Sequence, residues 1–328
     1  MTRQPLPVLL SHVLFALGHE YDKSKAYVPP LPYLMNLLRV LDTSGTDLKV
    51  LPGAARLSVR AIRDATKKAE RAGWLVVDNI GRGQKTVKLS IEGDELMKTG
   101  TSRLKAAEAT WQKRFGKGNM QQLRTSLAAI VGQLDIELPH YPSSYGQGDT
   151  SIHGGNYVES DAKSLRVPAH GAEWPVVIRE DRSVASQMSL CGLLSQVLCA
   201  FTIDYDANAE SSLAGLHTVL TFLQYADDAG MAVAEAKRLG GVNGSGRSTL
   251  ERHKLVVVES GAAILTPHGR RVRDRYPARV LKIEDDWCGL YGREHVSDLR
   301  ASLEHFDNKI DLDVPDYIDV SGWLRHRL

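Results

Sequence analysis

The sequence predicts a mainly α-helical protein with small β hairpins, in which one fold is present twice along the chain. The apolar segment at 9–17 recurs at 193–201, with matching residues 184 positions apart. Four later segments, one of which contains Trp111 and recurs at Trp287, share an offset of 176. A solenoid repeat has a period of about 20 to 50 residues. The much longer period therefore indicates a duplicated domain, and 328 residues is a length typical of two domains.

The duplication predicts three parts. We expect a first lobe over 1–140, a connector over 141–188 and a second lobe over 189–328. The connector is rich in Gly, Pro, Ser and aromatic residues, so we expect it to pack on the lobes, with a strand at Pro175–Arg179. Two copies of one fold can pack about a pseudo-two-fold axis, as the chains of a homodimer do. A single chain would then suffice for a dimer-like arrangement.

The first copy is expected to begin with three helices. Leu6–Gly18 is apolar on nearly every face and predicts a buried helix. Prolines follow at 29–32, and Tyr33–Leu41 then predicts a second helix because its leucines fall at helical spacing. Asp47–Leu57 predicts a short third helix, with its proline in the first turn.

A fourth helix and a β hairpin are expected next. Ser58 is a suitable N-cap for a helix over Val59–Ala72, and Gly73 is suited to end it in a left-handed conformation. Trp74–Asn79 reads as a strand, and Thr86–Ile91 alternates apolar and polar residues as a second strand does. A glycine-bearing turn lies between them.

Two long helices complete the copy. Glu92–Phe115 and Met120–Leu138 have helical patterns. Each copy then carries an apolar stripe that we expect to pack against the other stripe and against the first helix of each copy. The stripes comprise Leu123, Leu127, Ile130, Val131 and Leu134 in the first copy and Val296, Leu299, Leu303, Phe306 and Ile310 in the second.

This order of elements resembles the MarR-type family of bacterial regulators, over residues 5–138 and 189–312. The stretch that carries most of the resemblance is the fourth helix, the hairpin and Leu89–Gly93, which closes the hairpin and opens a helix. The resemblance implies tandem winged helix-turn-helix domains whose helical dimerisation arms form an intramolecular pseudo-dimer. It also implies duplex DNA as a partner and a pocket for a small-molecule effector near His12, Tyr33 and Trp111. Core packing is the alternative for these three residues.

The charge distribution favours a polyanionic partner for the first copy. The net charge is only +2, but residues 1–117 hold 20 Lys and Arg against 11 Asp and Glu, whereas residues 185–328 hold 16 against 20. A strongly basic block attracts polyanions such as nucleic acid. The alternative is a solvated surface and attraction between the two lobes.

The fourth helix is the candidate reader of DNA. Its basic residues fall at intervals of three or four and form one stripe: Arg56, Arg60, Arg63, Lys67 and Arg71. We expect Arg60 and Arg63, near the N-terminus, to contact base edges in the major groove. Lys67, Lys68 and Arg71 are expected to hold phosphates. The alternative is an ordinary solvated face with local pairing to Asp64 and Glu70.

The other face of this helix is expected to pack inward. It carries Val59, Ile62, Ala65 or Thr66, and Ala69, which are apolar or small and lie opposite the basic stripe. A helix with one basic and one apolar face can bind a polyanion while it stays anchored in a core.

The hairpin tip is a second candidate contact. The turn Gly81–Lys85 holds two glycines, with Arg82 at the apex and Lys85 at the start of the return strand. An arginine at such a tip can enter a narrow minor groove, where the negative potential is strongest. The alternative is a solvent-exposed turn.

The second copy departs from this pattern. The reader region Leu239–Leu250 contains four glycines, each of which costs a helix interior roughly 1 kcal/mol. We therefore expect a loop, a short helix over Ser248–His253 and a shorter hairpin than in the first copy. Arg247, Arg252 and Lys254 remain candidates to touch phosphate. The glycines also loosely imitate a phosphate-binding loop, but the preceding strand that such a loop needs is not predicted.

The sequence excludes several other classes of protein. We find no nucleophile elbow, dinucleotide fingerprint or metal-ligand spacing, so we expect no enzyme, metal or cofactor. No apolar run of about 18 residues predicts a membrane span, and the first residues do not form a secretory signal. Three cysteines without metal-type spacing fit a reducing cytoplasm.

The sequence thus predicts a cytoplasmic, sequence-specific DNA-binding regulator, a repressor rather than an activator, in which the first lobe dominates contact with DNA. The alternative is a sensor or protein-interaction module that has the winged-helix fold and does not read DNA. The glycine-rich reader region of the second copy favours this alternative.

Overall fold

The described part of the chain is mainly helical and carries small antiparallel sheets, as the sequence predicts. The structure is a computed structural model, and it describes residues 3–22, 31–57, 59–81, 83–138, 140–141, 157–159, 166–168, 183–206, 230–235, 251 and 254–312. Within these ranges, no helix combines the length and the apolar character that a bilayer crossing needs.

Four helices open the first half at the predicted places. Their bounds are α1 Leu6–Asp22, α2 Leu31–Leu38, α3 Leu51–Ala55 and α4 Val59–Arg71. The prediction of a helix from Asp47 onward was wrong, because Thr46–Asp47 forms a short strand, β1, that pairs with the hairpin. Only the part from Leu51, where a proline occupies the first turn, is helical.

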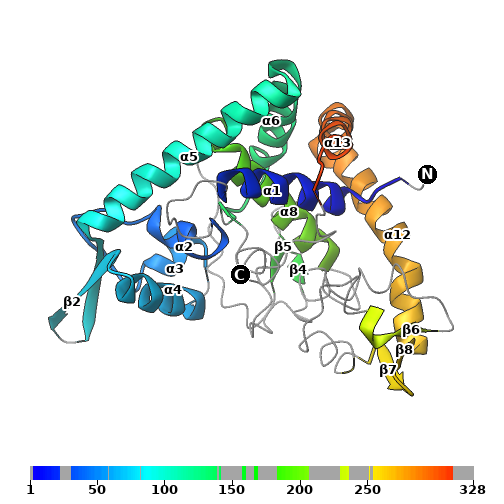
Figure 1. The fold of residues 1–328 in the computed structure, drawn as a ribbon, viewed down its shortest axis with the longest axis horizontal. Coiled ribbons are helices and arrows are strands. Elements are labelled where there is room, and N and C mark those ends of the chain that lie inside the picture. The colour runs from blue at the N-terminus through cyan, green and yellow to red at the C-terminus, as the bar shows by residue number, and fades with distance from the viewer. Residues whose placement is uncertain are drawn as a thin grey trace.

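The hairpin consists of β2 Leu75–Gly81 and β3 Gln84–Leu89, and the sheet order is β1-β3-β2. The inward side chains Leu75, Val87 and Leu89 pack against α2, α3 and α4 in a small core of their own. We call α2–α4 with β1–β3 the first small domain. In Figure 1 it lies at one end of the molecule, below α5.

The two long helices of the first half are α5 Ile91–Phe115 and α6 Lys117–Val131. The Ser90 side chain caps α5 by accepting a hydrogen bond from the Gly93 amide at 2.9 Å. Gly116, at φ 91°, separates the two helices. The predicted end of α6 at Leu138 was wrong: the helix ends at Val131, and residues 132–138 turn back towards the small domain.

The connector is described only at residues 141, 157–159, 166–168 and 183–188. The strands β4 Tyr157–Glu159 and β5 Arg166–Pro168 form an antiparallel pair, and α7 Val184–Gln187 precedes the second half. The strand predicted at Pro175–Arg179 lies outside the described residues.

The described elements of the second half follow the order of their counterparts in the first half. Its elements are α8 Leu190–Asp206, β6 Met231–Ala232, β7 Val256–Glu259, β8 Ala262–Leu265, α12 Pro267–Trp287, the π-helical turn η2 Cys288–Gly292 and α13 Arg293–Asp307. The hairpin β7–β8 is shorter than β2–β3, as predicted. The short helix predicted over Ser248–His253 lies outside the described residues except for Glu251.

The two halves match in detail. Helices α1 and α8 both have 17 residues and begin 184 positions apart, and α6 and α13 both have 15 residues and begin 176 apart. The sheet order β6-β8-β7 reproduces β1-β3-β2. Thr266 caps α12 from the same position as Ser90 caps α5, and Gly292 has the same positive φ as Gly116. These described elements therefore correspond to one another at the offsets that the sequence repeat predicts.

The central helices pack in a reciprocal pattern. Helix α1 lies against α8 and α6 lies against α13, so that equivalent helices face each other. In addition, α1 contacts α13 while α6 contacts α8. Such an exchange of equivalent contacts is the mark of a two-fold interface. In Figure 1, α1 and α8 lie at the centre, and the sheets β1–β3 and β6–β8 lie at opposite ends of the molecule.

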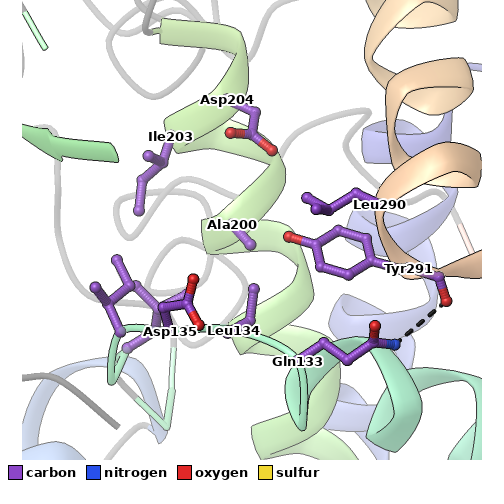
Figure 2. Close-up of a pocket in the computed structure, with 10 residues that line it drawn as sticks. Gln133, Leu134, Asp135, Ala200, Ile203, Asp204, Leu290 and Tyr291 are labelled. Atoms are coloured by element: carbon purple, nitrogen blue, oxygen red, sulfur yellow. Dashed lines mark hydrogen bonds between the residues drawn. The ribbon is translucent and has the colours of Figure 1, made fainter. Parts of the chain in front are cut away.

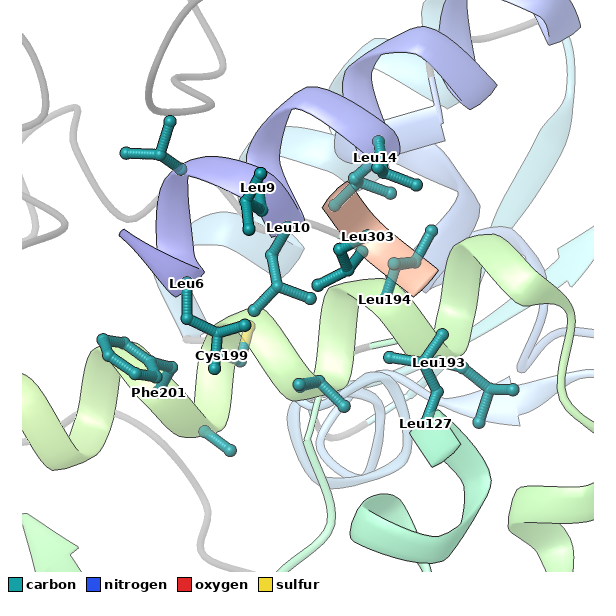
Figure 3. Packing of buried hydrophobic residues seen from close by; sticks show 14 of the residues in the cluster. Leu6, Leu9, Leu10, Leu14, Leu127, Leu193, Leu194, Cys199, Phe201 and Leu303 are labelled. Carbon is teal, nitrogen blue, oxygen red and sulfur yellow. The ribbon is translucent and has the colours of Figure 1, made fainter. Parts of the chain in front are cut away.

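One apolar core joins the halves. Leucines of α1, such as Leu10 and Leu14, face Leu193 and Leu194 of α8, and Leu303 of α13 completes the layer (Figure 3). All of these side chains are buried. The predicted stripes of the long helices are part of this core, apart from Ile310, which packs at its edge.

Arg124 and Arg300 occupy equivalent positions, and each binds a backbone carbonyl of the other half. Arg124 of α6 binds Glu108 of its own half at 2.5 Å and donates to the carbonyl of Met188, ahead of α8, at 2.6 Å. Arg300 of α13 binds Glu284 in the same way and donates to the carbonyl of Gln4, ahead of α1, at 2.9 Å. Gln4 and Met188 occupy equivalent positions, so the contacts of Arg124 and Arg300 follow the same two-fold pattern as the helices.

Candidate nucleic-acid interface

Helix α4 has one buried and one exposed face. Ile62, Ala65 and Ala69 are buried against α2 and β2 and belong to the core of the first small domain. The basic side chains on the other face are exposed: Arg63, Lys67, Lys68 and Arg71. Because Arg63, Lys67 and Arg71 are four residues apart, they form one ridge along the helix. Figure 1 shows α4 at the outer edge of the small domain, next to the hairpin.

Ion pairs within the described part of the chain do not balance the charges of this ridge. Among the residues that the structure describes, no carboxylate forms an ion pair with Arg63, Lys67 or Arg71. The predicted local pairing to Asp64 and Glu70 is therefore not present for these three. Like charges at this spacing repel each other by a few tenths of a kcal/mol per pair. A bound polyanion would remove this repulsion.

The prediction that Val59 packs inward was wrong. Its side chain is 60% exposed, because it lies in the first turn of α4, before the helix meets the core. Thr66, in contrast, is buried, as the inward face requires. Ser58 lies outside the described residues, and of Arg60 only the backbone, which is helical, is described.

The hairpin adds positive charge beside α4. Lys85, at the start of β3, is exposed. Lys88, further along the same strand, instead pairs with Asp78 of β2 at 2.8 Å. Arg82, the predicted tip residue, lies outside the described residues.

The inclusion of Arg56 in the basic ridge was wrong. Arg56 lies before α4, at the C-cap of α3, in a left-handed conformation with φ 57°. Its guanidinium donates to the carbonyl of Gly53 and pairs with Glu137 at 3.3 Å, and the side chain is only 15% exposed. It therefore joins the small domain to the segment that follows α6 and does not face solvent.

The surroundings of Arg56 form a polar anchor that sequence reasoning missed. Asn36 of α2 exchanges two hydrogen bonds with the backbone of Tyr141, at 2.9 and 3.1 Å, and is fully buried. Burial lowers the pKa of the neighbouring Arg39 to about 10, and burial also raises the pKa of Tyr141. No sequence motif marks these residues, since their contacts join segments about a hundred positions apart.

Two residues predicted near an effector pocket belong to the core between the halves. Trp111 is 2% exposed and stacks on Phe306 of α13 at 5.6 Å. His12 is buried, and its Nδ1 lies 2.7 Å from a carboxylate oxygen of Asp307. Both side chains thus take the alternative role that the sequence left open. The side chain of Tyr33 is outside the described set.

The second half offers one described candidate for phosphate contact. Lys254 is exposed and has φ 56°, and its amide donates to the carbonyl of Glu251 at 2.9 Å. Arg247 and Arg252 lie outside the described residues. Among the predicted DNA-contact residues, the exposed side chains that the structure describes therefore lie on the first small domain, apart from Lys254.

No protein-family model, curated protein or solved structure matches this chain.

Proposed function

We propose that this chain is a tandem winged helix-turn-helix protein that binds duplex DNA and represses transcription, acting as a single-chain pseudo-dimer. The observation that carries the proposal is the exposed ridge of Arg63, Lys67 and Arg71 on a helix whose opposite face is fixed in a core. A helix of this kind fits the major groove of B-DNA, where arginine can bind guanine edges through two hydrogen bonds.

The neighbouring elements support this reading. Val59 is exposed at the N-terminal end of α4, where reader helices meet base edges, and an apolar side chain there suits the methyl group of thymine. Lys85 on the adjacent hairpin is positioned to hold a phosphate. The ridge and the hairpin together would present one continuous cationic surface to the duplex.

The reciprocal packing of the halves favours recognition of a DNA site with two-fold symmetry. Two-fold proteins commonly bind two-fold DNA sites. Among the predicted DNA-contact residues, the exposed side chains that the structure describes lie on the first small domain, apart from Lys254. We therefore propose that one half-site is recognised strongly and the other weakly.

Selection of bound fragments from random duplex DNA tests the proposal. We expect enrichment of one motif, with one strongly specified half and a weak or absent second half. If the bound pool keeps the composition of the input, the chain does not read DNA, and the reading as a sensor or interaction module is favoured.

Substitutions on the ridge should separate two kinds of contact. Arg63→Ala should flatten the preference at one or two base pairs, because a bidentate arginine contributes about 1–3 kcal/mol of discrimination. Lys67→Ala should weaken binding to all sequences alike and reduce the slope of affinity against salt by about one unit. Fluorescence anisotropy with matched and mismatched duplexes measures both effects.

Arg56→Ala is the matched control. Arg56 is a basic residue four positions before Arg60, but its side chain forms an internal ion pair with Glu137. We expect it to lower the melting temperature and to leave the salt slope unchanged. A salt slope that falls with Arg56→Ala but not with Lys67→Ala would contradict the proposed interface.

A further inference from the structure

The second copy is acidic as a whole, but its positive charge is concentrated on one part of it. Residues 207–282, which run from the end of α8 to Lys282 of α12, hold 11 Lys and Arg against 7 Asp and Glu. Residues 283–328 hold 5 against 11. Even if every carboxylate of the stretch 207–282 forms an ion pair within it, four of its cations remain. The excess of positive charge therefore does not depend on which pairs form inside this stretch.

Helices α5 and α12 are equivalent, but their charges are arranged differently. The first turn of α5 is acidic and its last turn is basic, an order that suits the helix dipole. The first turn of α12 has no acidic residue and its last turn has no basic one. At the offset of 176, Arg270 and Arg271 take the places of Asp94 and Glu95. Cations at the start of a helix oppose its dipole, and such departures from local preference are expected at functional sites.

Lys254, Arg271 and Arg275 are exposed cations around the start of α12. Arg271 and Arg275 are four residues apart and therefore lie on the same face of the helix. The carbonyl of Lys254 accepts a hydrogen bond at 2.5 Å from the hydroxyl of Thr266, the N-cap of α12. Tyr276, on another face of α12, is buried in the central core. We call Lys254, Arg271 and Arg275 the second basic surface.

The other end of α12 is fixed to the central helices. The indole nitrogen of Trp287, the last residue of α12, donates to a carboxylate oxygen of Asp204 in α8 at 2.7 Å. Just beyond, Gln133 of the first half donates to the carbonyl of Tyr291 at 3.2 Å (Figure 2). These contacts set the position of α12 relative to the first half, so a partner need not order the helix on binding.

We propose that the second basic surface binds the phosphates of duplex DNA, in the half-site next to the one that α4 reads. The inference rests on the proposed function and gives the second half a contact without base preference. Arg and Lys bind phosphate oxygens through charge-assisted hydrogen bonds, which position a protein on DNA without reading its sequence. Figure 1 shows α4 and the start of α12, next to β8, on the same side of α1 and α8. One duplex along that side would pass both.

The inference does not require these three side chains to lack partners in the absence of DNA. Ion pairs between exposed side chains contribute little to stability. An arginine can therefore exchange an exposed carboxylate partner for a phosphate at little cost. A second half that holds phosphates in this way adds affinity to the complex, while the base preference stays with the first half.

The length of the duplex separates the contributions of the two halves. About 12 base pairs that carry the motif obtained by selection span one half-site, whereas about 30 base pairs also include the second, because half-sites lie about 10 base pairs apart. On the short duplex, the slope of log affinity against log salt is that of α4 and the hairpin β2–β3 alone. Exchange of Lys254, Arg271 and Arg275 for Gln should make the slope on the long duplex less steep by about 2–3. The same exchange should leave the slope on the short duplex unchanged.

Arg271→Glu copies Glu95 of the first half and separates a lost contact from a lost fold. Affinity for the long duplex, measured by fluorescence anisotropy, should fall at least about fivefold at about 0.1 M salt. The melting temperature should equal or exceed that of the unaltered chain, because an acidic residue suits the start of a helix.

Lys113→Gln is the matched control. Lys113 is exposed in the last turn of α5, and Figure 1 shows this end of α5 at the edge of the molecule away from α4 and from the hairpin β7–β8. The exchange should change neither the affinity nor the salt slope on either duplex.

The failure of this inference differs from the failure of the proposed function. If the unaltered chain binds neither duplex, the proposed function is contradicted. If it binds the selected motif with the same salt slope on both duplexes, and the three exchanges leave the slope on the long duplex unchanged, the second basic surface alone is contradicted. A new base sequence outside the motif should not alter the slope on the long duplex, because phosphate contacts carry no sequence information.

Discussion

Gly93→Ala and Gly269→Ala should each destabilise the protein severely. A Cβ at Gly93 would lie 1.8 Å from the carbonyl oxygen of Trp74, and one at Gly269 would lie 2.1 Å from that of Leu255. Neither oxygen can move aside as a flexible side chain does, because both carbonyls accept hydrogen bonds from the caps of α5 and α12, Ser90 and Thr266. Overpacking a core typically costs about 1–3 kcal/mol, and contacts this short place both variants above that range.

Thermal unfolding followed by circular dichroism measures the effect. The expected loss of more than about 3 kcal/mol corresponds to a fall in melting temperature of at least about 6 °C, at the roughly 2 °C per kcal/mol of large domains. Gly118→Ala is the matched control: Gly118 lies in α6, no atom comes within 4 Å of its added Cβ, and the exchange should be neutral or stabilising. Equal melting temperatures for Gly93→Ala and Gly118→Ala would contradict the close approach of Gly93 to the backbone of Trp74.

Arg300→Met is the second change with a large expected effect. The Arg300 and Glu284 side chains are 6% and 9% exposed, and their two hydrogen bonds are supplemented by one from Arg300 to Glu304 at 3.0 Å. Burial alone would lower the pKa of Arg300, but the hydrogen bonds and the charges of Glu284 and Glu304 raise it. Removal of Arg300 leaves the buried Glu284 carboxylate with the ion pair to the largely exposed Arg3 at 2.9 Å. Loss of one partner of a buried pair costs up to about 3–5 kcal/mol.

The duplication supplies the control for this prediction. Arg124 forms the equivalent clamp with Glu108, but these side chains are 28% and 21% exposed. Arg124→Met should therefore cost less, because water can solvate the carboxylate that remains. The double change of Arg300→Met with Glu284→Leu should recover much of the loss. Equal losses of unfolding free energy for Arg300→Met and Arg124→Met, measured by denaturant unfolding, would contradict the difference in burial between the two ion pairs.

The sequence was sufficient to predict what depends on local pattern. The repeat offsets predicted equivalent helices, and α1 and α4 begin at the predicted residues, Leu6 and Val59. The inward face of α4 followed from helical periodicity, except at Val59, whose exposure depends on where the helix first meets the core.

What the sequence could not show depends on contacts between distant segments. Arg56 has the spacing of the ridge, but a left-handed residue at the end of α3 turns its side chain towards Glu137. The sequence shows Arg124 and Arg300 only as equivalent residues of the two copies. Their role depends on hydrogen bonds to carbonyls of the opposite half.

The salt dependence of binding to duplex DNA tests the central claim most directly. Each phosphate contact contributes about −0.9 to the slope of log affinity against log salt. On α4 and β3 the described exposed cations are Arg63, Lys67, Lys68, Arg71 and Lys85. Five phosphate contacts predict a slope of about −4 to −5. Exchange of Arg63, Lys67 and Arg71 for Gln should bring this slope to about −2. A slope near zero for the unaltered chain, or the same slope after the exchange, would contradict the claim that α4 binds DNA.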